Sequence, residues 1–403
     1  MTTYAREEAA RRCGCDRAWL DQLIGLGILV PDGDDRLSVG DLRRAQTART
    51  MQLAGIRPEE LAAGIAKGVL TLNFMDAPIF ERFATYSDET FRQVSERTGI
   101  AIDLVTLIRE ATGAATPEPD DHIREDELVV VGFIQAQLAV GYRPVSIERW
   151  LRVTGDSLRR MAETESDAWR TDIMGPVMAR GGTAEELGAT SFEPEALALD
   201  PATNDAIVAL WHAHQTQTWT SNIVSGFEFA LTSAGMLTAP ARPPAICFLD
   251  ITGYTRLTNE RGDDAAANLA KGLSTLVQRT AVDHGGRPVK WLGDGVMVYF
   301  REAGPGVVAA LEMVDGVAAA GLPPAHVGLA AGPVLFQEGD YFGQTVNVAS
   351  RIAEYARPGE VLVTREVVAA AAADGGVSYT EIGPVELKGI TGPVQLLAAH
   401  RAG

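Results

Sequence analysis

The pattern of apolar and polar positions changes near residue 240. Before it, apolar residues recur every three or four positions, which predicts packed amphipathic helices. After it, short apolar runs such as AICFLDI, GVMVYF, HVGLAA and EVLVT alternate with helical patterns, and these runs predict strands. The Pro-rich segment TAPARPPA, residues 238–245, predicts a linker between the two parts. We therefore expect an all-α domain followed by an α+β domain.

Two corners in the helical part resemble one another. The segments QLAGIRPEEL (52–61) and QLAVGYRPVSI (137–147) each end a helix near a Gly and restart with a Pro after an Arg. Gly suits a helix end and Pro suits the first turn of the next helix, so each segment predicts two packed helices joined by a turn. We expect residues 1–202 to form one helical domain.

A long helix is predicted immediately before the linker. Residues 203–237 keep a helical pattern, with Asn204 suited to cap the first turn and Gly226 marking a break or bend. The aromatic surface of this helix exceeds what a free helix tolerates, so we expect it to pack on another element; it comes from Trp211, Trp219, Phe227 and Phe229. We interpret residues 203–243 as a transmitter helix and linker.

Charge and apolar content narrow the classes of function. The 403 residues carry a formal net charge of −18, which disfavours binding to nucleic acid or to an anionic membrane surface. The N-terminus lacks the apolar core of a signal peptide, and the apolar run at 128–140 is interrupted by Gln and is too short for a membrane span. The sequence therefore predicts a cytoplasmic protein with no membrane span.

Three cysteines are too few for a disulfide framework. Cys13 and Cys15 are one residue apart, too close to bridge comfortably, and Cys247 stands alone in an apolar strand. A Cys-x-Cys pair could supply half of a zinc site, but no His or further Cys lies nearby in the sequence. We favour plain reduced thiols, as expected in a reducing compartment.

The first 70 residues resemble the winged-helix DNA-binding head of MerR-type regulators. The resemblance rests on the order helix, turn, helix, a wing-like PDGDD hairpin (31–35) and a further helix. A DNA-binding head needs a basic face for phosphates, whereas residues 1–60 carry nine Arg and no Lys against ten acidic residues. We therefore expect a reused helical scaffold, and we do not expect DNA as a partner.

Two acidic residues mark the ends of predicted strands in the second half. Asp250 stands at the end of AICFLDI, and Asp294 lies in LGDG (292–295), where Asp-Gly predicts a hairpin tip. Carboxylates on neighbouring strand ends can hold Mg²⁺ or Mn²⁺, with phosphates supplying further oxygen ligands. The pattern alone is equally consistent with two unrelated residues, an Asp in a turn and an Asp at the end of a strand, that form no site together.

Further polar residues favour a nucleotide site. In GDYFGQTVNVASRIAEYA (339–356), a Gly-punctuated turn becomes a helix around Gln344, and Asn347 and Arg351 share one face of it. An amide and a guanidinium suit a ribose oxygen and a phosphate. Lys388 precedes a Gly on a predicted short strand and is a second phosphate partner. Two acids, two cations and an amide together predict a nucleotide–metal site.

Residues 244–400 resemble the class III nucleotidyl cyclase catalytic domain. The resemblance rests on D-I-T-G-Y-T (250–255), K-x-x-G-D (290–294) and D-x-x-G-x-x-V-N-x-A-S-R (340–351), all present without a gap. The combined pattern is specific, although each piece is weak by itself. The resemblance implies an α+β fold with a ferredoxin-like βαββαβ core and extra elements, which fits the predicted order of strands and helices.

The resemblance also implies a role for each matching residue. Asp250, Asp294 and the backbone carbonyl of Ile251 would hold two divalent cations per site, Mg²⁺ or Mn²⁺. Lys290 and Asp340 match the pair that selects adenine over guanine. The other matching residues would contact the triphosphate, the ribose or the departing phosphates, and they are Thr252, Gly253, Tyr254, Thr255, Asn347, Arg351 and Lys388.

The implied activity is that of an adenylate cyclase, which converts ATP to 3′,5′-cyclic AMP and pyrophosphate by two-metal-ion catalysis. In the family, the metal aspartates come from one subunit and the remaining residues from the other, so the resemblance implies a homodimer with two complete sites. Lys290 and Asp340 disfavour a guanylate cyclase. A DNA-binding or nucleotide-binding regulator with an idle cyclase domain is the alternative, and the intact metal pair weighs against it.

The helical half resembles, more loosely, the regulatory region found ahead of some bacterial soluble cyclase domains. In that group the region inhibits catalysis, responds to pH and can hold a fatty-acid-like ligand. His212 and His214 on the transmitter helix are compatible with pH sensing or with ordinary polar positions. Several residues fit either a lipid pocket or a plain core, namely Phe74, Met75, Phe80, Phe83, Met174 and Met178.

Overall fold

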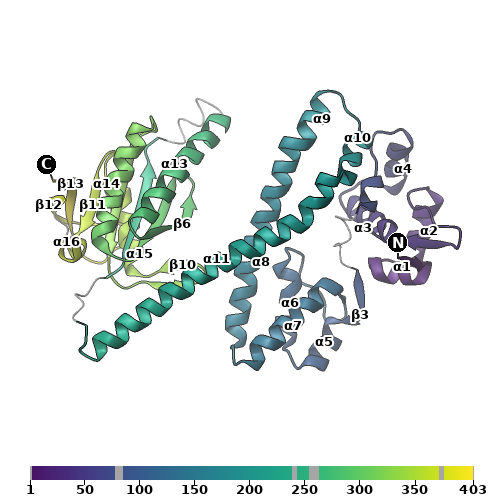
Figure 1. Cartoon of the computed structure of the whole chain (residues 1–403), viewed down its shortest axis with the longest axis horizontal. Coiled ribbons are helices and arrows are strands. Elements are labelled where there is room, and N and C mark those ends of the chain that lie inside the picture. The colour runs from purple at the N-terminus through teal and green to yellow at the C-terminus, as the bar shows by residue number, and fades with distance from the viewer. Residues whose placement is uncertain (1, 78–84, 238–242, 254–262, 372–375, 403) are drawn as a thin grey trace. The chain divides into compact units, whose positions relative to one another are not determined.

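The computed structural model describes residues 2–77, 85–237, 243–253, 263–371 and 376–402 of the chain (Figure 1). The chain divides into two compact units, Met1–Asn222 and Ile223–Gly403, and each is considered by itself. Most of the predicted Pro-rich linker lies outside the described residues. Within the described ranges, no helix is both long and apolar enough to cross a lipid bilayer.

The first unit contains the same succession of elements twice. Each copy runs strand, helix, helix, strand, helix, helix, and its two strands pair antiparallel. The first module consists of β1 (Thr3–Ala5), α1 (Arg6–Cys13), α2 (Arg17–Gly25), β2 (Arg36–Ser38), α3 (Val39–Leu53) and α4 (Pro58–Ala66). The second module consists of β3 (Tyr86–Thr90), α5 (Phe91–Thr98), α6 (Ile102–Ala111), β4 (His122–Arg124), α7 (Glu125–Ala139) and α8 (Pro144–Trp169).

The turns of the two modules correspond closely. Gly14 and Gly99 end α1 and α5 in the left-handed conformation, with φ of 67° and 70°, which glycine adopts without a steric penalty. A Gly with positive φ also follows α3 and α7, and Pro58 and Pro144 begin the next helices. The predicted likeness of the two corners is confirmed, and it extends to whole modules.

Each module has its own hydrophobic core and a buried acid at the same place. Asp41 and Glu127 are the third residues of α3 and α7, and each accepts a hydrogen bond from the backbone N–H that precedes its helix. Asp41 pairs with Arg44, and Glu127 pairs with Arg109. Each carboxylate therefore caps a helix and neutralises a buried guanidinium.

Of the predicted PDGDD hairpin the structure shows the turn, in which the N–H of Asp32 donates to the carbonyl of Arg36 at 2.9 Å, but no strand directly before it in the described residues 2–77. The segment is a turn, closed by the Asp32 carboxylate, which accepts hydrogen bonds from the N–H groups of Asp34 at 3.0 Å and Arg36 at 2.9 Å. The strand that follows, β2, pairs with β1 at the start of the chain, with Thr3 opposite Ser38. The resemblance of this region to MerR-type heads stays a prediction.

Short helices connect the second module to a long helix. They are the π-helical segment Arg170–Met174, α9 (Gly175–Ala179), α10 (Ala184–Ala189) and the 3₁₀ segment Thr190–Phe192. A further 3₁₀ segment, Asn73–Asp76, follows α4 in the first module. The long helix, α11, covers Pro194–Ser233 and contains 40 residues.

The transmitter helix differs from its prediction in three respects. Asn204 lies inside α11 and caps nothing, because the helix already begins at Pro194, a residue suited to a first turn. Gly226 does not break the helix, since its neighbours keep the helical hydrogen bonds. The expected packing of the aromatic side chains is not seen in the single chain, where Trp211, Trp219 and Phe227 are exposed.

The second unit is built on a seven-stranded sheet with the order β12-β13-β11-β8-β5-β7-β6. Its core order β8-β5-β7-β6, antiparallel throughout, with helices after the first and third core strands in the chain, confirms the predicted ferredoxin-like βαββαβ fold. The core elements are β5 (Ala245–Ile251), α13 (Asp263–Asp283), β6 (Gly286–Leu292), β7 (Gly295–Phe300), α14 (Ala303–Ala319) and β8 (Ala325–Ala331). The added elements are β9 (Leu335–Gln337), β10 (Asp340–Phe342), α15 (Gln344–Tyr355), β11 (Val361–Thr364), α16 (Arg365–Ala371), β12 (Val377–Val385) and β13 (Val394–Arg401).

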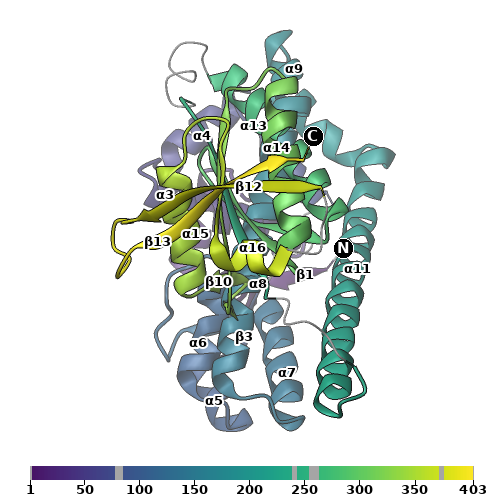
Figure 2. The ribbon, with the colours of Figure 1, turned by 90° about the vertical axis from the view of Figure 1, so that its left-hand side faces the viewer.

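The two faces of this sheet carry different helices (Figure 2). One face packs against α13, α14 and α16, and the other against α15. Gly328 of β8 fixes the position of α15, because a Cβ atom there would lie 2.3 Å from the backbone nitrogen of Ala353. Helix and strand therefore touch backbone to backbone.

Candidate active site

The structure brings Asp250 and Asp294 together at one end of the sheet. Asp250 is in β5, opposite Gly295 of β7, and Asp294 lies in the two-residue loop that joins β6 to β7. Gly293, with φ of 68°, makes this tight connection. A Cβ atom at Gly295 would lie 3.2 Å from Oδ1 of Asp250, so glycine leaves room for the carboxylate. The predicted hairpin tip is confirmed.

The environment of Asp250 favours its protonated form. Burial raises the pKa of this carboxyl, and the neighbouring negative charge of Asp294 raises it further. His326 in β8 partly offsets both effects, with its Nε2 atom 3.8 Å from Oδ2 of Asp250. A partly buried carboxyl beside a second negative charge is a fitting place for a cation.

The residues after Asp250 begin the predicted triphosphate loop. The N–H of Thr252 donates to the carbonyl of Pro324 at 2.9 Å, and its hydroxyl lies 3.2 Å from Nδ1 of His326. Gly253 is exposed and has φ of 79°, a conformation that favours glycine. Tyr254 and Thr255 lie outside the described residues.

The predicted adenine-selecting residues form an ion pair. The ammonium group of Lys290 in β6 donates to Oδ2 of Asp340 in β10. The other oxygen of Asp340 accepts from the N–H of Tyr341 at 2.8 Å, which fixes the orientation of the carboxylate. Register places Lys290 opposite Met297, on the face of the sheet that α15 covers. By strand alternation Asp250 points to that same face.

The predicted ribose and phosphate residues on α15 point away from the sheet. Asn347 is exposed and Arg351 is half-buried, while the residues that alternate with them are buried against β5 and β8. The guanidinium of Arg351 pairs with the Glu354 carboxylate, with Nη1 2.5 Å from Oε1. Both side chains therefore project outward, where they can meet another surface.

The expected strand position of Lys388 is wrong. This residue lies in the loop between β12 and β13, and its side chain is exposed. The loop turns at Gly389, with φ of 76°, and the N–H of Ile390 donates to the carbonyl of Leu387. Lys388 sits on a turn because the strand has already ended at Val385.

Sequence reasoning missed two features of this region. One is His326, which faces Asp250 only because β8 pairs with β5 in this register. The other is a cluster in which the rings of Tyr299 and Tyr341 stack 4.5 Å apart and Arg287 donates to the hydroxyl of Tyr341 at 2.8 Å. The apolar run HVGLAA predicted the strand β8, but no signal in the sequence predicted that β8 pairs with β5.

The donor set fits divalent cations that take part of their ligands from a nucleotide. Asp250, Asp294 and the carbonyl of Ile251 are all oxygen donors, as Mg²⁺ and Mn²⁺ prefer. No group of three or more His, Cys, Asp or Glu side chains suited to a metal occurs in the described part of the chain. The protein therefore offers two carboxylates and one backbone carbonyl here, and a nucleotide would complete the ligand set.

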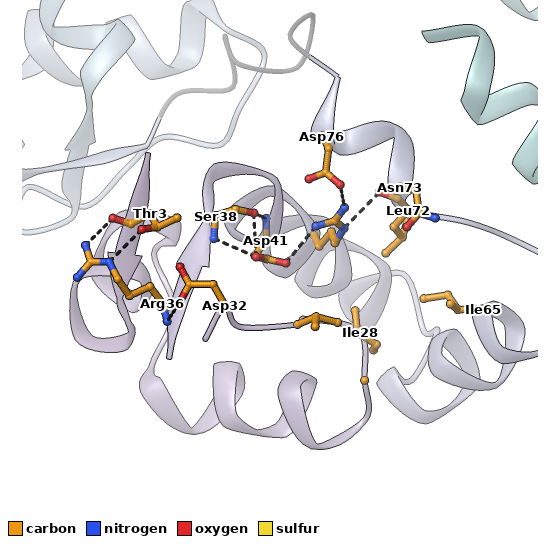
Figure 3. Close-up of a pocket in the computed structure, with 13 residues that line it drawn as sticks. Thr3, Ile28, Asp32, Arg36, Ser38, Asp41, Ile65, Leu72, Asn73 and Asp76 are labelled. Atoms are coloured by element: carbon orange, nitrogen blue, oxygen red, sulfur yellow. Dashed lines mark hydrogen bonds and ion pairs between the residues drawn. The ribbon is translucent and has the colours of Figure 1, made fainter. Parts of the chain in front are cut away.

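A cavity of about 490 Å³ lies in the first module (Figure 3). Its polar lining is partnered within the chain: Arg44 contacts Asp41 at 3.0 Å and pairs with Asp76, and Arg36 donates to the carbonyl of Thr3 at 2.6 Å. Its apolar lining comes from Ile28, Val30, Ile65 and Leu72. None of the described residues predicted for a lipid pocket lines it, and Phe80 and Phe83 lie outside the described residues.

Two family models match the chain. The adenylate cyclase regulatory domain matches residues 44–194, from α3 to the start of α11. The adenylate and guanylate cyclase catalytic domain matches residues 325–398, from β8 into β13. The order of the two matches agrees with the predicted order of a regulatory region and a catalytic domain.

Three named proteins align with different shares of the chain. A pH-sensitive adenylate cyclase of Mycobacterium tuberculosis is 28% identical over 421 aligned positions, covering 100% of this chain and 95% of the relative. An adenylate cyclase of Streptomyces coelicolor is 27% identical and covers 67% of this chain and 68% of the relative. The solved adenylyl cyclase CyaB from P. aeruginosa is 24% identical, with a TM-score of 0.36, and covers 40% of this chain and 95% of that structure.

The chain therefore carries a match to an adenylate cyclase regulatory domain followed by a match to an adenylate and guanylate cyclase catalytic domain. The relatives that align with two thirds or more of the chain include two proteins named adenylate cyclases.

Proposed function

We propose that the protein converts ATP to 3′,5′-cyclic AMP and pyrophosphate at two sites shared between the subunits of a homodimer. The observation that carries this proposal is the approach of Asp250 and Asp294, close enough for the charge of Asp294 to raise the pKa of Asp250. Such a pair costs free energy in an empty protein, and two bound divalent cations offset that cost.

Each residue of the site has a task in the proposed reaction. Asp250, Asp294 and the Ile251 carbonyl would hold Mg²⁺ or Mn²⁺, which would supply Lewis acidity for the attacking 3′-hydroxyl and for the phosphates. The amide of Asn347 orients the ribose so that its 3′-oxygen lies in line with the α-phosphorus. Arg351 and Lys388 neutralise the charge that accumulates on pyrophosphate as it leaves.

Adenine selection follows from the hydrogen-bonding groups of Lys290 and Asp340. The ammonium group donates to the N1 acceptor of adenine, and the carboxylate accepts from the exocyclic N6 amine. Guanine presents a donor and an acceptor in the reverse places, which leaves polar groups unpaired. The ion pair between the two side chains supports this role, because it holds both groups in position before the nucleotide binds.

Two observations support a shared site. Asn347 and Arg351 project from the face of α15 that points away from the sheet bearing Asp250 and Asp294. The catalytic unit also exposes large apolar side chains on β6, β9 and β10, namely Trp291, Leu292, Leu335, Phe336 and Phe342. Exposed apolar groups of this kind are typical of a surface that a partner covers.

We also propose that the helical half regulates catalysis, with pH or a fatty-acid-like ligand as the signal, in a cytoplasmic protein. The support is the regulatory domain match and the name of the pH-sensitive relative. His212 and His214, which lie exposed on α11, are the candidate residues for a response to pH.

The first test is formation of cyclic AMP from ATP by the purified protein with Mn²⁺, beside a GTP reaction. An Asp294→Ala variant is the control, because it removes one metal ligand and should lower kcat by at least about 100-fold. Activity that vanishes in the variant and is weak with GTP supports the proposal. If neither the full chain nor residues 238–403 forms a cyclic product, the catalytic domain is idle and the regulator alternative leads.

A further inference from the structure

The two sulfur atoms of Cys13 and Cys15 lie 3.0 Å apart in the first module. Cys13 is the last residue of α1, and Gly14 reverses the chain in the left-handed conformation, so both side chains project to the same side. The sequence spacing suggested that these residues are too close to bridge comfortably. The turn at Gly14 changes that expectation, because a disulfide of about 2.05 Å requires the sulfurs to approach by only about 1 Å.

The second module shows that the turn itself does not need sulfur. Its equivalent is Thr98-Gly99-Ile100, where Gly99 ends α5 with nearly the same φ. Thr98 and Ile100 there occupy the places of the two cysteines. The Thr98 hydroxyl donates to the Val94 carbonyl at 2.7 Å, within its own helix. The paired thiols are therefore an addition to the turn rather than a requirement of it.

The two thiols have different environments, as a nucleophile and a resolving thiol require. Cys13 is buried in the module core, whereas Cys15 is only half-buried. The hydrogen-bonded contact between the two thiols lowers the pKa of Cys15, and the same contact together with burial raises the pKa of Cys13.

We propose that Cys13 and Cys15 form a reversible dithiol–disulfide site that reacts with low-molecular-weight disulfides such as glutathione disulfide. The Cys15 thiolate attacks one sulfur of the reagent, which breaks the S–S bond and releases one thiolate that takes up the proton of Cys15. The Cys13 sulfur then attacks Cys15, which forms the protein disulfide and releases a second thiol that carries the proton of Cys13. Two electrons and two protons pass from the protein to the reagent.

The site lies where the first module meets the second. A Cβ atom at Gly14 would lie 2.5 Å from Cε2 of Tyr86 in β3, so the turn presses on that ring. The neighbouring Arg12 donates to Oε1 of Glu125 in α7 at 3.0 Å. Closing the disulfide changes the shape of a turn that belongs to the first module and contacts the second. Thiol chemistry at this turn would therefore act on the contact between the two modules.

The test counts free thiols in the full-length protein. The protein is equilibrated with excess glutathione disulfide, quenched in acid, unfolded, alkylated and weighed by mass spectrometry, with a dithiothreitol-treated sample alongside. We expect three alkylated thiols after reduction and one after oxidation, with a peptide map that links Cys13 to Cys15. Cys247 is the internal reference, because it is buried in β5 and burial raises its pKa to about 12.

A double variant, Cys13→Thr with Cys15→Ile, copies the turn of the second module and is expected to fold. It should show one alkylated thiol under both conditions. Retention of three thiols by the wild-type protein after oxidation overturns the proposal. A stable glutathione adduct at Cys15, or a disulfide between two chains, overturns it as well.

Discussion

Lys290 and Asp340 form an ion pair that joins strand β6 to the short strand β10, 50 residues further along the chain. The pair connects two motifs that are far apart in the sequence, and both side chains are partly exposed, so a base can reach them. Its two members differ in the group that they offer, a donor on one side and an acceptor on the other.

Removing either member should lower kcat/KM for ATP more than it lowers kcat/KM for GTP. Leaving one polar group unpaired in the complex costs about 1–3 kcal/mol, so we expect kcat/KM for ATP to fall by roughly 10-fold or more in Lys290→Ala and in Asp340→Ala. Steady-state kinetics with both nucleotides measure the ratio. Asp315→Ala, which removes an exposed carboxylate paired with Arg401, is the matched control. An unchanged ATP-to-GTP ratio in both site variants would contradict the assigned role.

The pKa of Asp250 predicts an unusual effect of pH and metal on stability. Its folded-state pKa is raised above the ordinary value of 3.8, so its contribution to stability is present below that value and is lost as pH rises through the folded pKa. Without metal at pH 7, Asp250→Asn should therefore unfold at a higher temperature than the wild type. With Mn²⁺ the order should reverse, because the variant lacks a ligand.

Thermal unfolding with EDTA and with a Mn²⁺ titration measures both parts of this prediction. Asp315→Asn removes the same charge away from the site and should respond to Mn²⁺ as the wild type does. The assignment of Asp250 fails if Mn²⁺ stabilises Asp250→Asn as strongly as it stabilises the wild type.

Sharing of the site between subunits can be tested by complementation. Asp250→Ala and Asn347→Ala should each be nearly inactive, because every site in either homodimer lacks one residue. Mixing them after dissociation produces hybrids with one intact site, so random pairing should restore about one quarter of the wild-type activity. If the mixed sample contains hybrids but stays inactive, both residues serve a site within one chain.

The buried ion pair of the second module should dominate its stability. Arg109 and Glu127 form two hydrogen bonds of 2.8 and 2.9 Å, and their side chains are 10% and 1% exposed. Glu127→Ala leaves a buried guanidinium unpaired and should cost about 3–5 kcal/mol in free energy of unfolding. Asp120→Ala breaks the exposed pair with Arg92 and should lower the free energy of unfolding far less, because solvent screens that pair. Urea unfolding of both variants gives the comparison, and similar losses would contradict it.

The strands and their acids could be predicted from the sequence because their signals are local. A short apolar run ending at Asp250 and an Asp-Gly tip at Asp294 each specify an element without knowledge of its neighbours. What the sequence could not supply is pairing. His326 faces Asp250 through the register of β8 on β5, and Lys388 lies on a turn because β12 ends three residues earlier.

The duplication of the helical half was visible only at its corners. Gly and Pro are conformationally specific, so they repeat as residues in both copies. Core positions need only size and apolar character, so Leu37 of β2 and Ile123 of β4 fill the same place with different side chains. For the same reason the shared buried acid is Asp41 in one module and Glu127 in the other.

The backbone contact at Gly328 determines what kind of motion can control this enzyme. With α15 seated on β8 without an intervening side chain, Asn347 and Arg351 have no room to sink toward the sheet or tilt independently of it. The catalytic domain therefore moves as a rigid body that carries both side chains with it. For the proposed shared site, a signal from the helical half would therefore act by moving whole catalytic domains rather than by rearranging individual side chains.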